Sequence, residues 1–427
     1  MAYVYAHPNL IGYNPASADY ANAVWFDLHS ANYNSEQPLT LVVGAQGSGK
    51  TFTLLNLTTL NALQGSCVVG IDWKGDLLPA AELSAITGFH TSRHKIEPPV
   101  EQFEDPNITP EERDELRNRN TGILDPFVMF INDKDPEQTK TDITIAVNAI
   151  CYALSPKEME YINIKTAIAE CVSDTYGFSA KEQRTMRTFL TRLMTLGHKR
   201  GDSQIQDYAG YLQHQLTDGA GKMLAAIPGH LPKEKFTVEP GITIIDLSTL
   251  PGLPQTTEDL KNPAMGVGQA IIAMLALYIR QTFTRMERNI RKTFVIDEAW
   301  AIIGNPIGGT LIDMFTRLGR SMNVAVLLGS QSFTDLFNDR TNFNSASVST
   351  YMAFKNSTKD ALVGLQGMGI EDEEEQKDLA SIFPQLRKGC CLMQDHRRRR
   401  GLVQHWVWDN RLKKLYNSNP NTTDQNN

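Results

Sequence analysis

A phosphate-binding loop is the strongest chemical signal in this sequence. Residues 44–51 read GAQGSGKT, which fits the pattern G-x-x-x-x-G-K-S/T. The glycines let the backbone wrap around a phosphate chain, whose charge the loop N–H groups and a helix N-terminus stabilise. Lys50 is expected to reach the β- and γ-phosphates, and the Thr51 hydroxyl to coordinate Mg²⁺. The predicted nucleotide contacts are Gly44, Ala45, Gln46, Gly47, Ser48, Gly49, Lys50, Thr51 and Phe52.

Two acids follow a second apolar run. Residues 293–296 are followed directly by Asp297 and Glu298. Ligands of open α/β sheets bind at the carboxyl edge of such strands. Asp297 is expected to hold Mg²⁺ through water, and Glu298 to polarise the attacking water as a general base. Alone, the pattern suits an ordinary strand end with solvated acids equally well. The phosphate loop favours the catalytic interpretation.

Three further residues are candidates for the same reaction. Gln331 follows the apolar run 324–328, which we expect beside the strand that carries Asp297. A glutamine there can bond both the γ-phosphate and water, although a helix-capping turn is the alternative. Arg317 and Arg320 lie at i and i+3 on one helix face. Either could reach a neighbouring subunit's phosphate as an arginine finger, and a solvated face is the alternative.

Three other polar runs have several interpretations. The run Arg397–Arg400 fits a hairpin tip that binds nucleic acid, pairs with a partner's acids or supplies an arginine in trans, and a solvated or interface role is more common. The acidic run 371–375 is most simply a solvated loop. Asp72, followed by residues 73–76 (WKGD), is expected at the sheet edge, facing either the nucleotide or a ring centre. A structural turn is the alternative there.

The elements that must position these residues alternate between strands and helices. Residues 39–43 and 67–72 read as buried strands around a helix over 49–63. A strand over 241–247 precedes a helix over 266–288, and a helix over 308–320 separates the strands 293–297 and 324–328. Such units build a mostly parallel sheet with right-handed crossovers, which is an α/β fold.

The domain organisation follows from changes in composition. Residues 1–134 are predicted to hold the first part of the core, with a polar surface insertion over 92–120. Residues 135–235 are predicted to form an all-helical insertion, with a capping box at 179–182. Residues 236–416 are predicted to hold the second part of the core, and residues 417–427 to form a disordered tail.

Composition limits the class of protein. The 427 residues are 41% hydrophobic and 21% charged, as in a soluble globular protein, and the net charge of −7 does not suit a general polyanion binder. Nucleic acid would need a local basic patch. Five cysteines without a C-x-x-C pair support neither zinc nor a disulfide framework. No signal peptide or spanning segment is read, so we expect a cytoplasmic protein whose membrane contact is peripheral, through partners.

The motifs together resemble a family. GAQGSGKT, IDWKGD, LDPF, a long helical segment, TIIDLSTLP, FVIDEAW and LLGSQSFTDL occur in an order similar to that of the C-terminal ATPase domain of the conjugative-transfer, type IV secretion ATPases (the TraC/TraE-like group), within the HerA–FtsK superfamily of ring-forming motors. The resemblance covers about residues 20–410. Three features are more specific for this family than the phosphate loop is: the Asp-Glu-Ala-Trp box, Ser-Gln-Ser and the helical insertion.

The resemblance implies a RecA-like P-loop NTPase core with an inserted all-α subdomain, ATP and Mg²⁺ as cofactors, and a hexamer docked at the cytoplasmic base of a secretion channel. Family roles carry over to Lys50, Thr51, Asp297, Glu298 and Gln331. The family's basic residues fall near Arg317 and Arg320, where RLGRS departs from the usual Arg-Lys pair. The family usually carries an N-terminal domain ahead of the motor, so the chain resembles an excised domain or a short relative.

Three functions remain open from the sequence. The first is an ATP-hydrolysing motor that energises conjugative DNA transfer or type IV secretion. The second is a DNA-pumping translocase or coupling protein of the same superfamily, and the third is a nucleotide-dependent scaffold without hydrolysis. The motor interpretation requires that the stretches around Lys50 and Glu298 meet across adjacent strands.

Overall fold

The chain falls into two compact units. The computed structural model describes residues 9–16, 23–33, 36–72, 74–96, 109–111, 122–131, 135–155, 157–178, 180–218, 227, 237–249, 266–303, 312–313, 315–317, 319, 321–338 and 343–417. The first unit comprises Met1–His94, Val238–Asp246 and Thr282–Asn427, and the second comprises Lys95–Thr237 and Leu247–Gln281.

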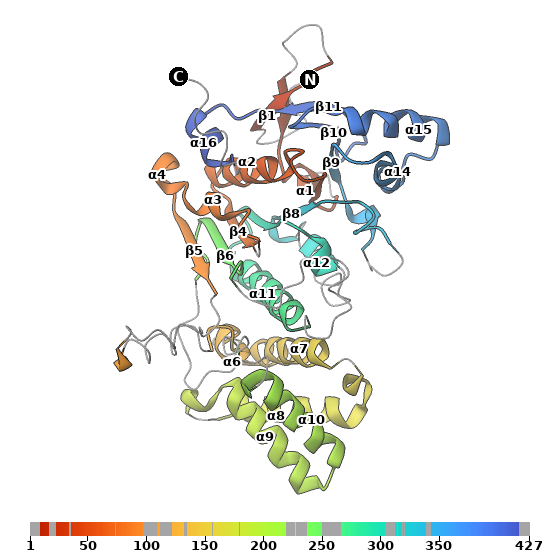
Figure 1. Cartoon of the computed structure of the whole chain (residues 1–427). Coiled ribbons are helices and arrows are strands. Elements are labelled where there is room, and N and C mark those ends of the chain that lie inside the picture. Colours follow the sequence, from red (N-terminus) through yellow and green to blue (C-terminus); the bar gives the residue numbers. More distant parts are fainter. Residues whose placement is uncertain are drawn as a thin grey trace. The chain divides into compact units, whose positions relative to one another are not determined.

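One large sheet forms the centre of the first unit (Figure 1). Its order is β2-β1-β11-β10-β9-β3-β8-β7-β4-β6-β5. The strands are β1 Asn9–Tyr13, β2 Ala23–Phe26, β3 Leu39–Val43, β4 Cys67–Asp72, β5 Thr91–Lys95, β6 Gly241–Asp246, β7 Lys292–Ile296, β8 Val324–Ser330, β9 Thr350–Phe354, β10 Cys390–Gln394 and β11 Arg400–His405. The pairings from β9 across to β6 are parallel, and those that join β9, β10, β11, β1 and β2 are antiparallel.

Burial on both faces explains the apolar strands. Every residue of β3, β4, β6 and β7 is buried, as expected of parallel strands covered by helices on both sides. The helices of this unit are α1 Ser30–Tyr33, α2 Lys50–Leu63, α3 Leu78–Ala81, α4 Ser84–Thr87, α12 Trp300–Ile303, α14 Thr358–Gly367, α15 Glu373–Ile382 and α16 Asn410–Leu415. The longest is α2, whose Leu54 and Leu57 pack into one core with Val42 of β3 and Val68 of β4.

The predicted strands and the parallel α/β sheet are confirmed, but one predicted adjacency is wrong. β8 pairs with β3 on one side and with β7 on the other. The strands that precede Lys50 and Asp297 are therefore separated by one strand rather than adjacent. Their carboxyl ends still share one edge, because all three strands run in parallel.

The antiparallel end of the sheet was not predicted as such. β10 and β11 form a hairpin whose tip carries Arg397–Arg399, as expected for the basic run, and β1 and β2 extend it. Helices α14 and α15 lie side by side at this end (Figure 1). The acidic run 371–375 is not a loop, since Glu373 begins α15 behind the N-cap Asp372. Acids in a first helical turn are stabilised by the helix dipole.

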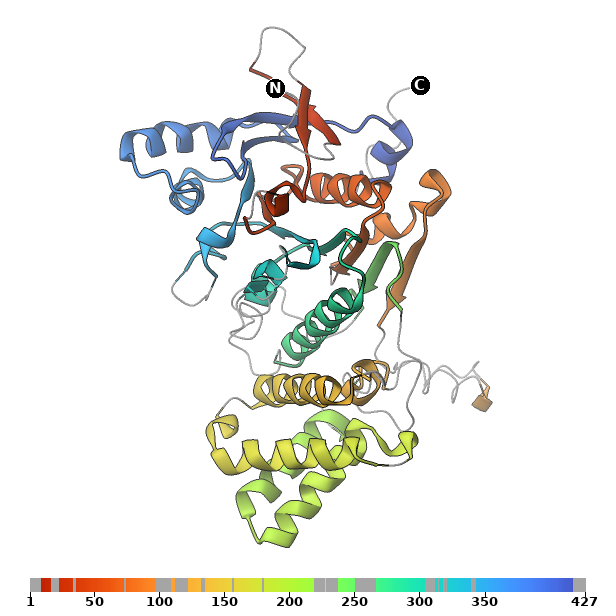
Figure 2. The same cartoon turned by 180° about the vertical axis from the view of Figure 1, so that it is seen from behind.

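The second unit is helical in its described part (Figure 2). Its helices are α6 Pro126–Met129, α7 Pro136–Leu154, α8 Ile162–Tyr176, α9 Met186–Arg200, α10 Ser203–Gln213 and most of α11 Gly266–Arg285. It is longer than the insertion predicted for residues 135–235, because residues 95–134 and 247–281 belong to it. The N-cap of α9 is Thr185, whose hydroxyl accepts the Thr188 N–H. The capping box predicted at 179–182 lies partly outside the described residues, which do not include Ser179.

Two predicted segments lie largely outside the described residues. They are the polar insertion 92–120, apart from residues 92–96 and 109–111, and the tail 417–427, apart from Asn417.

Candidate functional site

The phosphate loop connects β3 to α2 and is anchored on both neighbouring strands. The Gly44 N–H donates to the Ser330 carbonyl at 3.1 Å, and the Ala45 N–H to the Lys355 carbonyl at 3.0 Å. Gly49 precedes the helix with φ 110°, and a Cβ there would lie 2.9 Å from the Gly389 backbone. Both the dihedral and this close approach require glycine. The loop therefore ends at a helix N-terminus whose first N–H groups have no partner within the helix.

Lys50 and Thr51 meet the acid Asp297. The Lys50 ammonium is ion-paired and hydrogen-bonded to Asp297 and lies 3.5 Å from Glu298 Oε1. The Thr51 hydroxyl donates to Asp297 Oδ2 at 3.3 Å. Burial acts to lower the pKa of Lys50, but the two carboxylates outweigh it and raise that pKa. The pairing of the phosphate loop with the strand-end acids is thus direct.

Asp297 lies against β8. A Cβ on Gly329 would come within 2.5 Å of Asp297 Oδ1 and 2.7 Å of Leu54. The Ala299 N–H donates to the Gly329 carbonyl at 2.6 Å, which ties the turn after β7 to the same strand. Gly329 therefore provides the space in which the Asp297 carboxylate reaches Lys50.

Glu298 is held by contacts from three segments. Its Oε1 accepts the Gln331 amide at 2.7 Å and lies 3.3 Å from the Lys74 ammonium, and its Oε2 accepts the Trp300 indole N–H at 2.6 Å. Its backbone has φ 71°, a region that non-glycine residues rarely adopt and that is typical of active sites. Burial acts to raise the pKa of Glu298, but Lys50 and these partners outweigh it and lower that pKa. The group is fixed and ionised.

The segment after β4 is a turn organised by Asp72. The Asp72 carboxylate accepts the N–H groups of Lys74 at 3.2 Å, Gly75 at 2.8 Å and Leu77 at 2.8 Å. Burial raises the pKa of Asp72 to about 6. The structural-turn interpretation thus fits Asp72, whereas Lys74 and Asp76 line the cavity described next. Burial, followed by the charge of Asp297, raises the pKa of Asp76.

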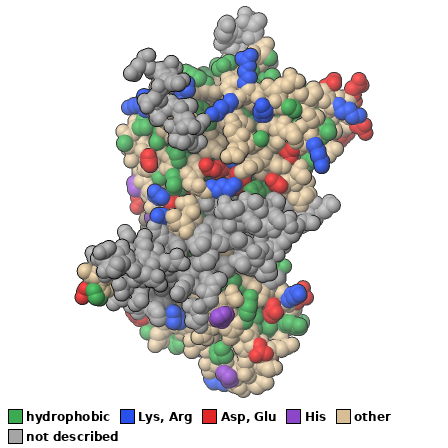
Figure 3. Space-filling view, in the orientation of Figure 1, with side chains coloured by type: hydrophobic (Ala, Val, Ile, Leu, Met, Phe, Trp, Pro, Cys, Tyr) green, Lys and Arg blue, Asp and Glu red, His purple; other side chains and the backbone are tan. Residues whose placement is uncertain are grey.

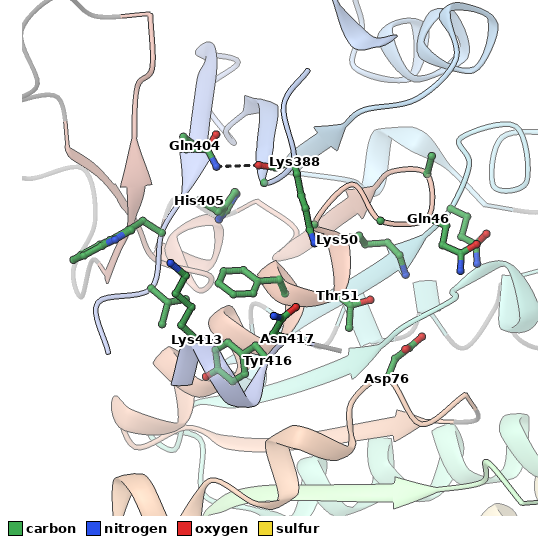
Figure 4. A pocket seen from close by; sticks show the side chains of 18 of the residues that line it. Gln46, Lys50, Thr51, Asp76, Lys388, Gln404, His405, Lys413, Tyr416 and Asn417 are labelled. Carbon is green, nitrogen blue, oxygen red and sulfur yellow. Dashed lines mark hydrogen bonds between the residues drawn. The ribbon is translucent and has the colours of Figure 1, made fainter. Parts of the chain in front are cut away.

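A cavity of about 790 Å³ adjoins these residues. Figure 4 shows Lys50, Thr51 and Asp76 on one side of it and Lys413, Tyr416 on the other. The lining also includes Tyr13, Phe52, Trp406 and Asn417. The Phe52 and Tyr416 rings meet edge to face at 5.7 Å. The cavity thus has a charged end at the phosphate loop and an aromatic end.

The charged end fits a metal-bound triphosphate. Within the part of the chain that the structure describes, the Ser48 hydroxyl oxygen is buried without a hydrogen-bond partner, and the space around Gly47 is open. A hydroxyl and a carboxylate, on Thr51 and Asp297, are oxygen donors of the type that Mg²⁺ prefers. Within the described residues no group of three or more His, Cys, Asp or Glu side chains could hold a metal by itself. A metal here would therefore need phosphate oxygens and water to complete its ligands.

The structure brings together five of the predicted catalytic and metal residues, namely Lys50, Thr51, Asp297, Glu298 and Gln331. It does not bring Arg317 to them within one chain, since that side chain is 74% exposed and paired with Asp313 at 2.7 Å. Arg320 lies outside the described residues. Sequence reasoning missed the contacts of Lys74 and Trp300 with Glu298. The adjacent motifs WKGD and DEAW were the available signal.

The basic run is largely occupied within the chain. Arg398 donates to the Met368 carbonyl at 2.9 Å, Arg399 is paired with Asp395 at 2.5 Å and Arg400 with Glu375 at 2.5 Å. Figure 3 shows basic and acidic side chains gathered together at the end of the first unit that carries α15 in Figure 1. This face is mixed in charge rather than a basic patch.

Comparison with known proteins gives one family. The model of the family described as "AAA-like domain" matches residues 23–415. A Bacillus subtilis (strain 168) protein described as "Uncharacterized protein YddE" is 24% identical over 284 residues, which are 66% of this chain and 31% of that protein. The chain therefore matches about a third of that relative's length.

Two solved proteins share the fold. VirB4 of Thermoanaerobacter pseudethanolicus matches with a TM-score of 0.69 and 15% identity, over 96% of this chain and 98% of that chain. The plasmid coupling protein TrwB in complex with the non-hydrolysable ATP analogue ADPNP matches with a TM-score of 0.54 and 14% identity, over 88% and 87%. TrwB has also been solved with ADP and Mg²⁺. These likenesses confirm the predicted α/β fold class.

No helix within the described residues combines the length and apolar character needed to span a bilayer.

Proposed function

Because the chain belongs to the family of AAA-like domains, we propose that it is an ATP-hydrolysing motor that energises conjugative DNA transfer or type IV secretion. The observation that carries the proposal is the meeting of Lys50 and Thr51 with Asp297 and Glu298 at one sheet edge. The likeness of the fold to VirB4 and to the conjugative coupling protein TrwB supports the proposed role in conjugation or secretion.

ATP and Mg²⁺ are the proposed cofactors, as in the TrwB complexes. The loop residues Gly44, Ala45, Gln46, Gly47, Ser48 and Gly49 surround the phosphates, and Lys50 exchanges its carboxylate partners for phosphate oxygens. Thr51 and Asp297 would hold the metal, which when bound would stabilise the charge that develops on the transferred phosphoryl group. Glu298 accepts the proton of the attacking water. Gln331, bonded to Glu298, orients that water and contacts the γ-phosphate.

The aromatic end of the cavity is the proposed place for the ribose and base. Phe52 directly follows the phosphate loop, and its ring meets that of Tyr416, which lies across the cavity from Lys50 (Figure 4). Trp406 also lines the cavity. Aromatic faces stack on any purine, because stacking needs no particular hydrogen-bond pattern. The chain thus accommodates a whole nucleoside triphosphate within its first unit.

The working form that we propose is a homo-oligomer, a hexamer by analogy with the ring-forming motors. The exposed Arg317, together with Arg320, would complete a neighbour's site in trans. Such an assembly would dock on other components of a membrane-spanning channel, from the cytoplasmic side and without inserting into the membrane itself. Within this assembly we propose that the helical residues 135–235 act as a subdomain inserted into the motor core.

The second candidate is a translocase or coupling protein that acts directly on nucleic acid, as the likeness to TrwB would allow. A polyanion-binding surface needs unpaired cations. The ion pairs of Arg399 and Arg400 and the bond of Arg398 to a carbonyl leave little of the basic run for that purpose. We therefore favour the motor that drives export through partners.

The experiment that tests the function is ATP turnover by the wild type and by Glu298→Gln, measured with and without single-stranded DNA. We expect Mg²⁺-dependent hydrolysis by the wild type, and a fall of about 10²–10⁴-fold in the variant with ATP binding kept. Strong stimulation by DNA would favour the translocase. Unchanged turnover in the variant would remove Glu298 from its role, and binding without turnover by the wild type would favour the scaffold.

A further inference from the structure

We infer that Lys74, in the turn after β4, is a positioning residue that holds Glu298 in its catalytic orientation once a nucleotide has drawn Lys50 away. The inference rests on the proposed function and adds to it a residue that the phosphate loop and strand-end acids do not include.

Four donors surround the Glu298 carboxylate, which is 2% exposed. Trp300 bonds Oε2, and Gln331, Lys74 and Lys50 approach Oε1 at 2.7, 3.3 and 3.5 Å. A carboxylate has about four acceptor positions. Among the described residues the Gln331 amide and the Trp300 indole are hydrogen-bonded to it, and the two ammonium groups approach Oε1 as ion pairs. Three groups therefore crowd Oε1, which has about two acceptor positions.

Nucleotide binding changes the groups around Glu298 by moving Lys50. The lysine of a phosphate loop contacts the β- and γ-phosphates, so Lys50 must leave the carboxylates of Asp297 and Glu298. Its departure removes one of the three groups that crowd Oε1, which leaves space there for the attacking water. It also removes one of the two cations beside Glu298 while the γ-phosphate brings negative charge. Lys74 is then the cation that keeps Oε1 in place.

The turn that carries Lys74 is held in place by backbone hydrogen bonds. The Asp72 carboxylate fixes the backbone of residues 74, 75 and 77, and Gly75 takes φ 88°. The Lys74 side chain is 23% exposed and its ammonium lies over the Trp300 ring, 5.9 Å from the centroid. The same lysine thus contacts both Glu298 and the indole that bonds Glu298. Because backbone bonds hold the turn, a substitution of the side chain leaves the turn intact.

The test compares Lys74→Met and Lys74→Arg with the wild type and with Lys377→Met, which removes an exposed lysine of α15. The measurements are kcat and KM for ATP and the affinity for a non-hydrolysable ATP analogue. We expect Lys74→Met to lower kcat about ten- to hundredfold, comparable to the loss of one hydrogen bond to a charged group, because the ion pair with Glu298 is lost. KM and analogue affinity should stay within about threefold of the wild type. Lys74→Arg, which keeps the charge, should recover most of the lost kcat.

A double-mutant cycle with Glu298→Gln shows whether Lys74 acts through Glu298. If it does, Lys74→Met has no further effect on kcat in the Glu298→Gln background. Equal losses in both backgrounds, or a raised KM with unchanged kcat, would overturn the inference and make Lys74 an independent or phosphate-binding group. If the wild type hydrolyses ATP and Lys74→Met has the same kcat, the inference is refuted while the proposed function stands. Absence of Mg²⁺-dependent hydrolysis by the wild type refutes the proposed function and the inference with it.

Discussion

The side-chain amide of Gln331 lies 2.7 Å from Oε1 of Glu298, although the two residues follow different strands and are 33 positions apart. The contact joins the ends of β7 and β8, which pair in parallel. It links the group proposed to activate water with the group proposed to sense the γ-phosphate.

Loss of the Gln331 amide should therefore impair turnover rather than binding. We expect Gln331→Ala to lower kcat about ten- to hundredfold, because one hydrogen bond to a charged group is lost. Gln331→Glu should be worse, since it places a second carboxylate beside Glu298. Steady-state kinetics with analogue binding measures both. A higher Kd with unaltered kcat would make Gln331 a binding residue only.

Lys50 should be required for nucleotide binding. Replacement by alanine removes the cation that faces the phosphates and leaves Asp297 and Glu298 to repel them, so we expect affinity for ATP to fall at least about a hundredfold. Titration calorimetry with a non-hydrolysable analogue and Mg²⁺ measures this. Lys377→Ala is the matched control. Binding by Lys50→Ala within threefold of the wild type would contradict the site.

Arg317 and Arg320 should act between subunits. Arg317 is exposed and paired only locally with Asp313 in the described structure, so Arg317→Ala should leave ATP binding unchanged and lower turnover in the assembled state. The turnover per subunit of the wild type should rise with protein concentration. Arg200→Ala, which breaks another exposed ion pair, is the control.

Mixing two variants of lowered turnover tests the arrangement in trans. Arg317→Ala keeps its own Glu298, and Glu298→Gln keeps its own Arg317, so mixed assemblies contain some complete sites. Recovery of part of the wild-type turnover supports Arg317 as an arginine finger. A mixture of Arg320→Ala with Glu298→Gln tests Arg320 in the same way. If neither mixture exceeds the sum of its components, these arginines do not complete a neighbour's site.

His405 should make stability depend on pH. Burial lowers its pKa to about 3, against an ordinary value of about 6.5. Since the unfolded chain binds the extra proton between these values, the free energy of unfolding falls as pH drops below 6.5, by about 2 kcal/mol at pH 5 from this residue. Urea unfolding at pH 7.5 and pH 5 should show a smaller pH effect in His405→Met than in the wild type or in the exposed-site control His198→Met. An equal pH effect in all three would contradict the prediction.

The sequence predicted the parts of the fold that local patterns determine. Buried strands such as Leu39–Val43 are short, β-branched and flanked by turn residues, and their position around Gly44–Thr51 is what the phosphate loop requires. The order of strands is not a local property. The insertion of β8 between β3 and β7, and the antiparallel extension through β10, β11, β1 and β2, depend on long-range pairing that apolar runs do not specify.

The site was predicted in its residues but not in its contacts. The types and spacing of Lys50, Thr51, Asp297 and Glu298 carry their chemistry, whereas the contacts of Lys74 and Trp300 depend on a turn fixed by Asp72 and on the left-handed backbone of Glu298. The start of α9 likewise depends on a distant residue, because the N–H of its first residue, Met186, donates to the Asp125 carboxylate 61 positions earlier.

The most direct test of the central claim is a crystal structure of the chain with Mg²⁺ and a non-hydrolysable ATP analogue. We predict the triphosphate along residues 44–51, Lys50 moved from Asp297 to the β- and γ-phosphates, the metal between Thr51 and Asp297, and the γ-phosphate facing Glu298 and Gln331. A nucleotide bound elsewhere, or a γ-phosphate more than about 10 Å from Glu298, beyond the reach of one bridging water, would contradict the account.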